Sequence, residues 1–514
     1  MRRVTSLLTS RTARSLRGCL AVLALAIVPL LSPATARSLP SAAPQTVTLK
    51  VSEFNIEYGG THVSFDKVIQ AIRQGGADVV GIEEAQGHTA RLARALGWPY
   101  YSSRLQILSK FPIIDPPGGD SLYVFIQVTP GHVVAIENVH LPSNPYGPFW
   151  VKQGIPRADV LAKERELRLP AVRPSLHVAK GLIAEGIPVF LTGDFNAPSW
   201  RDWTSQMVGV RYQINYAVRW PVSVAVERAG FVDSYREVHP SPLRDPGLTW
   251  WAARPDLPGW DPGKTAPEDR IDFVYAAGAA QATRSIIVGE RGRAGVDVGI
   301  SPWPSDHRAT VSTFEVTPSP TPVLVAVQRR LLPVGKDVVT IFHTPGVGDE
   351  QVAIVPAGGN PMTDTIDAQP TGEAVDGALT FPTGTWQAGD YEAVLLDGAG
   401  GELSRIAFWL KEPGKGTVIS TGASSYAVGA PIDVAWSNAR GERWDWIGVY
   451  RQGADPHVAY YLLWAYTGAT VEGSLVLDDS ANGRFPLKAG NYSVYILRDD
   501  GYVKMAAADF TITG

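Results

Sequence analysis

The chain has almost no cysteine. Its 514 residues include a single one, Cys19, which stands just before an apolar run near the N-terminus. If residues 1–36 are removed from the mature protein, no thiol is left. Such a chain can form no disulfide, no cysteine-ligated zinc site and no cysteine nucleophile, so a disulfide-stapled scaffold is excluded.

The apolar run near the N-terminus is too short for a comfortable membrane span. It extends from Leu20 to Leu31, whereas a spanning helix needs ~20 apolar residues. Arginines at positions 2, 3, 11, 14 and 17 precede it, and the small residues Ala34 and Ala36 follow. This order is typical of a secretion signal, so we expect residues 1–36 to be a signal peptide and the mature protein to be secreted and extracellular. The alternative is an uncleaved membrane anchor.

An excess of positive charge is missing as well. Removing residues 1–36 takes five arginines and no acid from 46 Lys+Arg and 50 Asp+Glu, which leaves 41 basic and 50 acidic residues, a net charge of −9. Binding to nucleic-acid phosphates rests on neutralisation by Lys and Arg. A general nucleic-acid-binding protein is therefore disfavoured, although a local basic groove would still allow nucleic acid as a substrate.

The length favours two or three domains, because single hydrophobic cores stop growing at about 250–300 residues. Residues 47–316 alternate apolar strand-like runs with helical stretches, which predicts an α+β domain. The proline-rich stretch Thr317–Pro322 is typical of an extended linker and marks a boundary. The expected strands are 48–54, 79–82, 133–139, 188–192, 271–275 and 309–314, and the expected helices are 65–75 and 175–185.

The residues after this linker contain an internal repeat. Val-Gly-Lys-Asp-Val at 334–338 matches Val-Gly-Ala-Pro-Ile at 428–432, and Gln-Ala-Gly-Asp-Tyr at 387–391 matches Lys-Ala-Gly-Asn-Tyr at 488–492. Both copies are rich in short alternating strands with Gly, Pro and Asp turns. We therefore expect two all-β immunoglobulin-like sandwich domains, over residues 323–412 and 417–514.

The second copy carries the motif Asp-Trp-Ile-Gly-Val-Tyr at residues 445–450 and Trp-Ala-Tyr at 464–466. This motif resembles that of SKICH-like sandwich domains. Core packing explains most such aromatic residues, and the alternative is contact with a ligand, a cell surface or a polymer. Exposure would separate the two explanations for Trp444, Trp446, Tyr460, Tyr461 and Trp464.

Polar residues follow several predicted strands of the first segment. A polar residue in such a place is more often a turn or cap residue, but a series of them in one domain is hard to explain as turns. Metal-assisted phosphoryl transfer needs oxygen ligands for a hard cation, a group that orients water and an acid for the leaving oxygen. The candidates are Asn55, Glu84, His140, Asp194, Asn196, Asp272, Asp306 and His307.

The stretches that carry these residues resemble the successive motifs of the endonuclease/exonuclease/phosphatase superfamily. The resemblance covers residues 48–316 and implies a four-layer α/β/β/α sandwich with its site at one edge of both sheets. Gly-Asp-Phe-Asn and Ser-Asp-His are its most specific pieces. In chain order the motifs read Asn-Ile-x-x-Gly, Ile-Glu-Glu, Leu-Ser-Lys-Phe-Pro-Ile, Asn-Val-His-Leu, Gly-Asp-Phe-Asn, Arg-Ile-Asp-Phe and Ser-Asp-His-Arg.

The resemblance implies a metal site. Glu84 would be the principal ligand of Mg²⁺, or of Mn²⁺ or Ca²⁺. Its neighbour Glu83 would point to the opposite face of the strand, because successive side chains alternate. Asn55 would help to hold the metal or the phosphate, and Asp306 would be a further carboxylate near the cation.

The resemblance also implies the catalytic residues. His307 would be the general base, or the cation that stabilises the phosphorane, and Asp272 would orient it. Asp194 and Asn196 would position the attacking water and the phosphoryl oxygens. His140 would act as an acid or phosphate donor opposite His307. Relatives often hold this second histidine with a Glu or Tyr that precedes it, and we assign no residue of this sequence to that role.

Two further stretches could meet substrate. Residues 239–268 form a Pro/Trp-rich insertion with Trp250, Trp251 and Trp260, for which loop packing is the alternative. Arg157, Lys163 and Arg165 could meet an anion, although a solvated helix face explains them more simply.

Taken together, these features predict a secreted, divalent-metal-dependent phosphoesterase, with phosphodiester hydrolysis favoured. The alternatives are a phosphomonoesterase acting on inositol phosphates, an extracellular nuclease, and an inactive binding or adhesion protein. His140 argues against the abasic-site nucleases, which usually lack this histidine.

Overall fold

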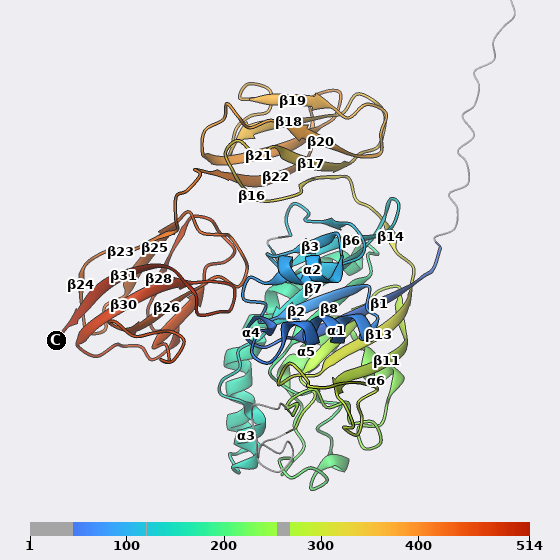
Figure 1. The fold of residues 1–514 in the computed structure, drawn as a ribbon, viewed down its shortest axis with the longest axis vertical. Helices are drawn as coiled ribbons and strands as arrows, with labels where there is room; N and C mark the ends of the chain where they lie inside the picture. Colours follow the sequence, from blue (N-terminus) through green and yellow to red (C-terminus); the bar gives the residue numbers. More distant parts are fainter. Residues whose placement is uncertain (1–44, 120, 254–267) are drawn as a thin grey trace, which may run out of the picture. The chain divides into compact units, whose positions relative to one another are not determined.

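Figure 1 shows the computed structural model of the chain, which describes residues 45–119, 121–253 and 268–514. The expected signal peptide, residues 1–36, lies outside the described residues, and so does Trp260. Within the three described ranges, no helix combines the length and the apolar character that crossing a membrane requires.

The α+β class expected of the first segment is confirmed, because two mixed sheets with helices precede an all-β region. The first sheet has seven strands, in the order β12 (Val298–Ile300), β11 (Ala280–Glu290), β13 (Ala309–Val316), β1 (Val47–Asn55), β2 (Val79–Glu83), β4 (Ile107–Ser109) and β3 (Tyr100–Ser102). The second runs β5 (Ile113–Ile114), β6 (Tyr123–Thr129), β7 (His132–His140), β8 (Val189–Asp194), β10 (Asp272–Ala277) and β9 (Val232–Asp233).

Apolar side chains from the two sheets pack against each other. Val51 of β1 and Ile136 of β7 belong to one buried cluster between them. Helices α1 (Phe65–Gly75) and α2 (Thr89–Leu96) bury their apolar faces against the first sheet. Helices α4 (Arg157–Ala184) and α5 (Pro221–Arg228) do the same against the second. In α1 the buried positions 68, 69 and 72 follow the helical period, which is why its bounds agree with the prediction.

Helix α4 is much longer than predicted, because it begins at Arg157 and continues through Pro170 and Pro174. A proline inside a helix removes a backbone donor and normally ends the helix. Tertiary contacts favour the longer helix. Arg168 is fully buried, pairs with Glu164 at 2.6 Å one turn earlier and donates to two backbone carbonyls of the segment before the helix.

The all-β region holds two segments with related strand patterns. In the first, a sheet of β15 (Leu324–Val327), β17 (Val338–His343) and β20 (Asp376–Phe381) accompanies one of β16 (Leu331–Pro333), β22 (Glu402–Lys411), β21 (Gly389–Leu396), β18 (Gln351–Pro356) and β19 (Asp367–Pro370). In the second, a sheet of β23 (Val418–Thr421), β25 (Ile432–Ser437) and β28 (Gly473–Leu477) accompanies one of β24 (Ser425–Ala427), β31 (Lys504–Thr513), β30 (Gly490–Leu497), β26 (Trp446–Arg451), β27 (Leu463–Tyr466) and β29 (Asn482–Gly483). In both segments a short early strand pairs in parallel with the last strand.

The aromatic residues of the second all-β segment differ in exposure. Trp444 and Trp446 are buried, and Tyr461 and Trp464 are partly buried. Tyr460 is 90% exposed, so core packing does not explain it.

The predicted linker is partly structured, since Ser319–Pro320 forms a short strand, β14, that pairs with β7.

Candidate active site

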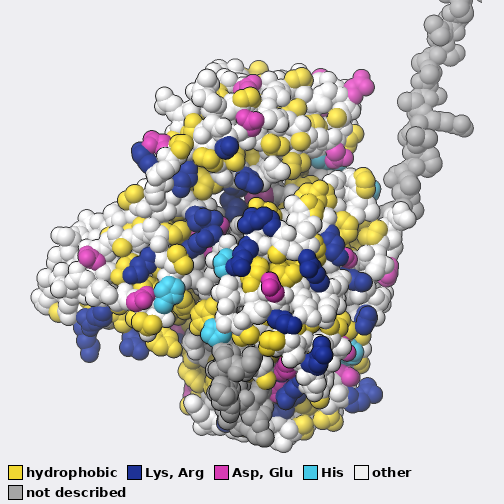
Figure 2. Space-filling model, viewed as in Figure 1, with side chains coloured by type: hydrophobic (Ala, Val, Ile, Leu, Met, Phe, Trp, Pro, Cys, Tyr) yellow, Lys and Arg dark blue, Asp and Glu magenta, His cyan; other side chains and the backbone are white. Residues whose placement is uncertain are grey.

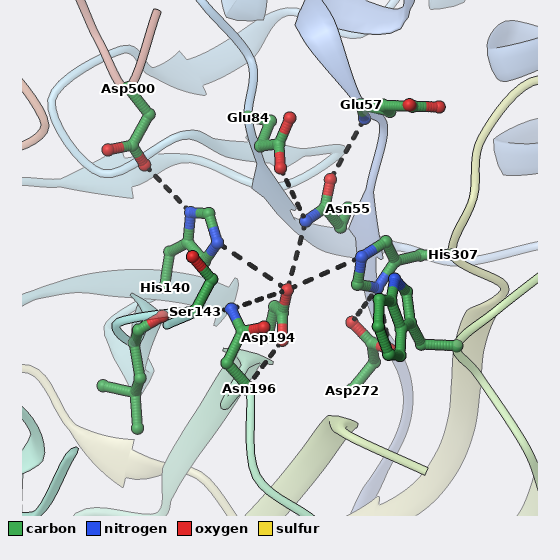
Figure 3. Close-up of polar contacts among 12 residues, drawn as sticks. Asn55, Glu57, Glu84, His140, Ser143, Asp194, Asn196, Asp272, His307 and Asp500 are labelled. Carbon is green, nitrogen blue, oxygen red and sulfur yellow. Dashed lines mark hydrogen bonds and ion pairs between the residues drawn. The ribbon is translucent and has the colours of Figure 1, made fainter. Parts of the chain in front are cut away.

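The ends of six strands meet at one edge of the two sheets. Strands β1, β2, β7 and β8 end there, and β10 and β13 begin there. The register sets neighbours side by side, because His140 pairs with Asp194 and Asp194 pairs with Asp272. All the predicted site residues belong to one network of polar contacts at this edge, and Figure 3 labels all of them except Asp306.

Asp194 is the centre of this network. Its Oδ2 accepts hydrogen bonds from Nδ2 of Asn55 and Nδ2 of Asn196, each at 3.2 Å. Its Oδ1 accepts from the backbone N–H of Asn196 at 2.8 Å, across a turn in which Asn196 has a φ of 48°. Asparagine tolerates this left-handed conformation better than most residues. Burial and the charge of Asp272 raise the pKa of Asp194 to about 6, against the opposing effect of two histidines.

His307 is held by Asp272. Its Nδ1 lies 3.0 Å from Oδ1 of Asp272, and both side chains are buried. An ionised carboxylate only accepts hydrogen bonds, so Nδ1 carries a proton and Nε2 faces the site. That Nε2 lies 3.7 Å from Oδ2 of Asp194. Burial lowers the pKa of His307, but the charges of Asp272 and Asp306 outweigh it and hold this pKa well above its usual value.

His140 has the same arrangement with a different partner. Its Nδ1 lies 3.1 Å from Oδ2 of Asp500, and its Nε2 lies 3.6 Å from Oδ2 of Asp194. Burial lowers the pKa of His140, but the hydrogen bond to Asp500 and the nearby carboxylates raise it to about 10. Asp500 was missed at the sequence level, because it belongs to the second all-β segment and lies in no motif.

Glu84 and Glu83 separate as expected from the alternation of a strand. Glu83 is buried, and burial together with the charge of Asp272 raises its pKa well above the usual value. Glu84 is partly exposed and accepts hydrogen bonds from Nδ2 of Asn55 at 3.3 Å and from the backbone N–H of Tyr58 at 3.1 Å. Glu84 is therefore the acid of this pair that faces the site.

The part of the chain that carries this site matches a family of known proteins. The Endonuclease/Exonuclease/phosphatase family matches residues 53–307. These residues form a domain of that family. An uncharacterized protein of Caenorhabditis elegans is 28% identical over 249 residues, which cover 45% of this chain and 79% of that protein.

Two solved structures also resemble the chain. An endonuclease/exonuclease/phosphatase from Beutenbergia cavernae is 15% identical, covers 71% of this chain and 100% of its own, and has a TM-score of 0.33. A mannosyl-6-phosphatase of Bacteroides thetaiotaomicron is 15% identical, covers 52% of this chain and 99% of its own, and has a TM-score of 0.29.

The family consists of metal-dependent phosphoesterases, and the phosphoesterase domain has residues that fit a divalent cation. Among the described residues, ligand atoms of Asp194, Asp272 and His307 lie within 4.8 Å of one another. Two of these residues are already hydrogen-bonded as an acid–imidazole pair. A hard cation prefers oxygen ligands, which makes Glu84 and Asp306 stronger ligands than an imidazole.

Two predicted metal ligands have further contacts in the phosphoesterase domain. Asn55 directs its Nδ2 at Glu84 and Asp194, so in the structure its amide donates to the acids that would face the cation. Its role as a ligand stays a prediction. Asp306 accepts a hydrogen bond from Nε1 of Trp250 at 3.3 Å, and its Oδ1 lies 3.9 Å from Nε2 of His307.

The described part of the Trp-rich insertion reaches the site of the phosphoesterase domain through Trp250. Trp250 stacks on Trp251 with ring centroids 4.4 Å apart, and both are partly exposed. Trp250 also packs edge-on against Tyr146, with ring centroids 5.0 Å apart. Of the cations considered earlier, Arg157 lies over the ring of Tyr216 and Lys163 pairs with Glu166. Arg165 lines a groove along α4.

Proposed function

We propose that the phosphoesterase domain hydrolyses phosphate esters, and phosphodiesters first, by attack of water with the help of a divalent cation. The observation that supports this most strongly is the pair of imidazoles on one oxygen. His140 and His307 direct Nε2 at Oδ2 of Asp194 from two sides, and each has a carboxylate behind its Nδ1.

Each side chain of the site has its own role in this reaction. Asp194 and Asn196 orient the attacking water, because their oxygens accept hydrogen bonds where the two histidines converge. His307, fixed by Asp272, stabilises the charge that develops on the phosphoryl oxygens or takes the proton of the water. His140 is protonated at neutral pH, since its pKa is about 10, and gives a proton to the leaving oxygen.

Glu84 and Asp306 would hold the cation, with Asn55 and Asp194 beside it, and Mg²⁺ is the ion we expect, with Mn²⁺ or Ca²⁺ as alternatives. The bound cation would polarise the phosphoryl group. The chemistry of the donors supports this, since the carboxylates that meet at this edge carry more negative charge than two imidazoles can balance.

The aromatic surface near the acids supports the diester class. A phosphodiester carries an organic group on each side of the phosphorus. Trp250 and Trp251 lie on the Asp306 side, and Tyr58, which is 46% exposed, adjoins Glu84 through its backbone. Each could contact one of these organic groups.

One observation favours a nuclease as the second candidate. A groove of about 740 Å³ between α4 and α5 is lined by His177 and by the cations Arg165, Arg173, Lys180, Arg219 and Arg228, and its lining holds no acid among the described residues. Such a groove suits the backbone of a polyanion. On the face shown in Figure 2, by contrast, Lys and Arg side chains are spread among hydrophobic and acidic ones.

We further propose that the protein is secreted, on the strength of the signal-like residues 1–36 and the lack of cysteine after them. The two all-β segments would be immunoglobulin-like sandwiches, the second of SKICH type, within the domain limits 323–412 and 417–514. The exposed Tyr460 supports contact with a cell surface or polymer through the second of them.

The proposal is tested by turnover of a substrate panel. The panel holds a generic diester, a generic monoester, plasmid DNA, RNA, sphingomyelin and inositol phosphates, each with Mg²⁺, Mn²⁺, Ca²⁺ or EDTA. His307→Ala and Asp194→Asn should lower turnover by about 10²–10⁴. His132→Gln is the matched control, because His132 begins the strand that His140 ends. Turnover that persists in EDTA or in both site variants would contradict the proposal.

The groove is tested separately. Arg173→Ala with Lys180→Ala should weaken the binding of DNA and lower its dependence on salt, while turnover of the small diester stays unchanged. Arg484→Ala with Lys488→Ala, two exposed cations of the second all-β segment, is the control. Equal binding of DNA by both double variants would reject the nuclease candidate.

A further inference from the structure

The residue behind His140 comes from outside the phosphoesterase domain. Asp500 lies in the turn between β30 and β31 of the second all-β segment. Both of its carboxylate oxygens have partners. Oδ2 lies 3.1 Å from Nδ1 of His140, and Oδ1 accepts a hydrogen bond from the hydroxyl of Tyr466 at 2.8 Å. The contact is therefore a built one rather than a chance approach of two exposed side chains.

The turn that carries Asp500 is held in an uncommon shape. Asp499 and Asp500 have φ values of 49° and 57°, in the left-handed region. Such a conformation is uncommon for a residue other than glycine, so it persists only where contacts fix it. Here the N–H of Asp499 donates to Oδ1 of Asp445, and the N–H of Asp500 donates to the carbonyl of Trp444.

Asp499 fixes the same turn to the phosphoesterase domain. Its Oδ1 accepts from Nε2 of Gln106 at 2.6 Å, and its Oδ2 accepts from the N–H of Gly87 at 2.5 Å. The side chain is fully buried. Gly87 has a φ of 81°, in the left-handed region that favours glycine, and a Cβ there would displace the guanidinium of Arg498. The loop after Glu84 and the turn before Asp500 are thus packed together.

A second contact lies behind His140 on the same strand. Nη1 of Arg443 donates to the carbonyl of Asn138 at 2.9 Å, two residues before His140. The N–H of Arg443 donates to the carbonyl of Arg104 at 3.1 Å. Two loops of the second all-β segment therefore contact the active-site edge. Arg443 contacts the strand that ends at His140, and Asp499 contacts the loop that follows Glu84.

We infer that the second all-β segment completes the active site, with Asp500 as the positioning residue of His140. Asp500 relates to His140 as Asp272 relates to His307, since each carboxylate accepts a hydrogen bond from Nδ1–H and so turns Nε2 toward Asp194. In relatives, the residue that holds this histidine often precedes it in the chain. In this protein the second all-β segment supplies that residue. Asp445, the first residue of the Asp-Trp-Ile-Gly-Val-Tyr motif, supports Asp500 indirectly, because it accepts a hydrogen bond from the N–H of Asp499 in the same turn.

Kinetics give the first test, and they rest on the proposed function. Asp500→Asn and Asp500→Ala should lower kcat by about 10–100-fold with KM nearly unchanged, and Asp500→Glu should recover part of the loss. Asp479→Asn, an exposed acid of the same segment, should behave as the wild type. His140→Gln with Asp500→Asn should be no slower than His140→Gln alone, because Asp500 acts through His140. Multiplying losses in the double variant would overturn the inference.

A second test does not need a substrate. In the wild type labelled with ¹⁵N-histidine, the Nδ1 proton of His140 should give a downfield resonance, assigned by its loss in His140→Gln. It should vanish or shift in Asp500→Ala and in Asp500→Asn, shift less in Tyr466→Phe, and stay in Asp479→Asn. A resonance whose chemical shift is unchanged in both Asp500 variants would overturn the inference, even if these variants lose activity. If the resonance responds while no substrate on the panel turns over, the positioning contact stands and the proposed function fails.

Discussion

His140 and Asp500 lie 360 residues apart in the sequence, and Nδ1 of the one is 3.1 Å from Oδ2 of the other. The equivalent pair, His307 and Asp272, is 35 residues apart and lies within one domain. The His307–Asp272 pair therefore forms within the phosphoesterase domain alone. The His140–Asp500 pair depends on a segment that must fold and pack against that domain.

The His307 side of the site gives the most direct prediction. Asp272→Asn keeps the shape of the side chain but removes its charge, so the amide can hold His307 in the wrong tautomer. We expect kcat on the best panel substrate to fall by about 10²–10⁴ with the fold retained. Steady-state kinetics and thermal unfolding check this, with Asp159→Asn, an exposed acid on α4, as the control. A wild-type kcat in Asp272→Asn would show that this carboxylate does not act through His307.

The two candidate sets of metal ligands can be separated by titration. Glu84→Gln should raise the Mg²⁺ or Mn²⁺ concentration needed for half-maximal activity at least about tenfold, because it removes an oxygen ligand at the site. Asp272→Asn should lower kcat without changing that concentration. Glu83→Gln is a closely matched control, since Glu83 is the buried neighbour that faces away. Calorimetric binding of Mn²⁺ gives the same comparison without substrate. A larger effect in Asp272→Asn than in Glu84→Gln would favour the Asp194, Asp272 and His307 set instead.

The pKa of His140 predicts a pH-dependent contribution to stability. The folded pKa is about 10, above the value of 6.5 for a free histidine. Protonated His140 therefore stabilises the fold fully below pH 6.5, and this stabilisation is lost as the pH rises through about 10. The difference in thermal midpoint between wild type and His140→Gln, measured in EDTA, should shrink between pH 7 and pH 10. A difference that stays constant over this range would mean that the imidazole is neutral in the fold.

Much of the site could be predicted because strand geometry is local. Asn55, Glu84 and Asp194 follow apolar runs whose period is that of buried strands, and parallel neighbours bring such ends to one edge. Helix α1 was predicted for the same kind of reason, since its apolar residues repeat with the helical period.

What could not be predicted depends on tertiary contacts. Helix α4 continues through Pro170 and Pro174, against the local preference of proline, while buried Arg168 ties it to the preceding segment. Asp500 has no local signal, because its role arises only where its turn meets β7. Trp250 could be named as a candidate, but only the structure places its ring beside Asp306.

The last prediction concerns Glu137, a buried acid on β7. Burial raises its pKa to about 8, and the nearby charge of Arg443 lowers it only in part. Because the folded pKa exceeds the unfolded value, the stabilisation from the protonated acid is present below about pH 4.5 and is lost as the pH rises through about 8. The limiting slope is about 1.4 kcal/mol per pH unit. Glu137→Gln keeps the size and removes this dependence.

Glu137→Gln should therefore gain stability relative to wild type as the pH rises from 5 to 8. Urea midpoints at several pH values measure the gain, and Glu185→Gln, an exposed acid after α4, should follow the wild type at each pH. The opposite result, a variant that loses stability relative to wild type between pH 5 and pH 8, would mean that Glu137 is ionised and pairs with Arg443. The contact of Arg443 with the strand of His140 would then be an ion pair between the two segments rather than a set of backbone hydrogen bonds alone.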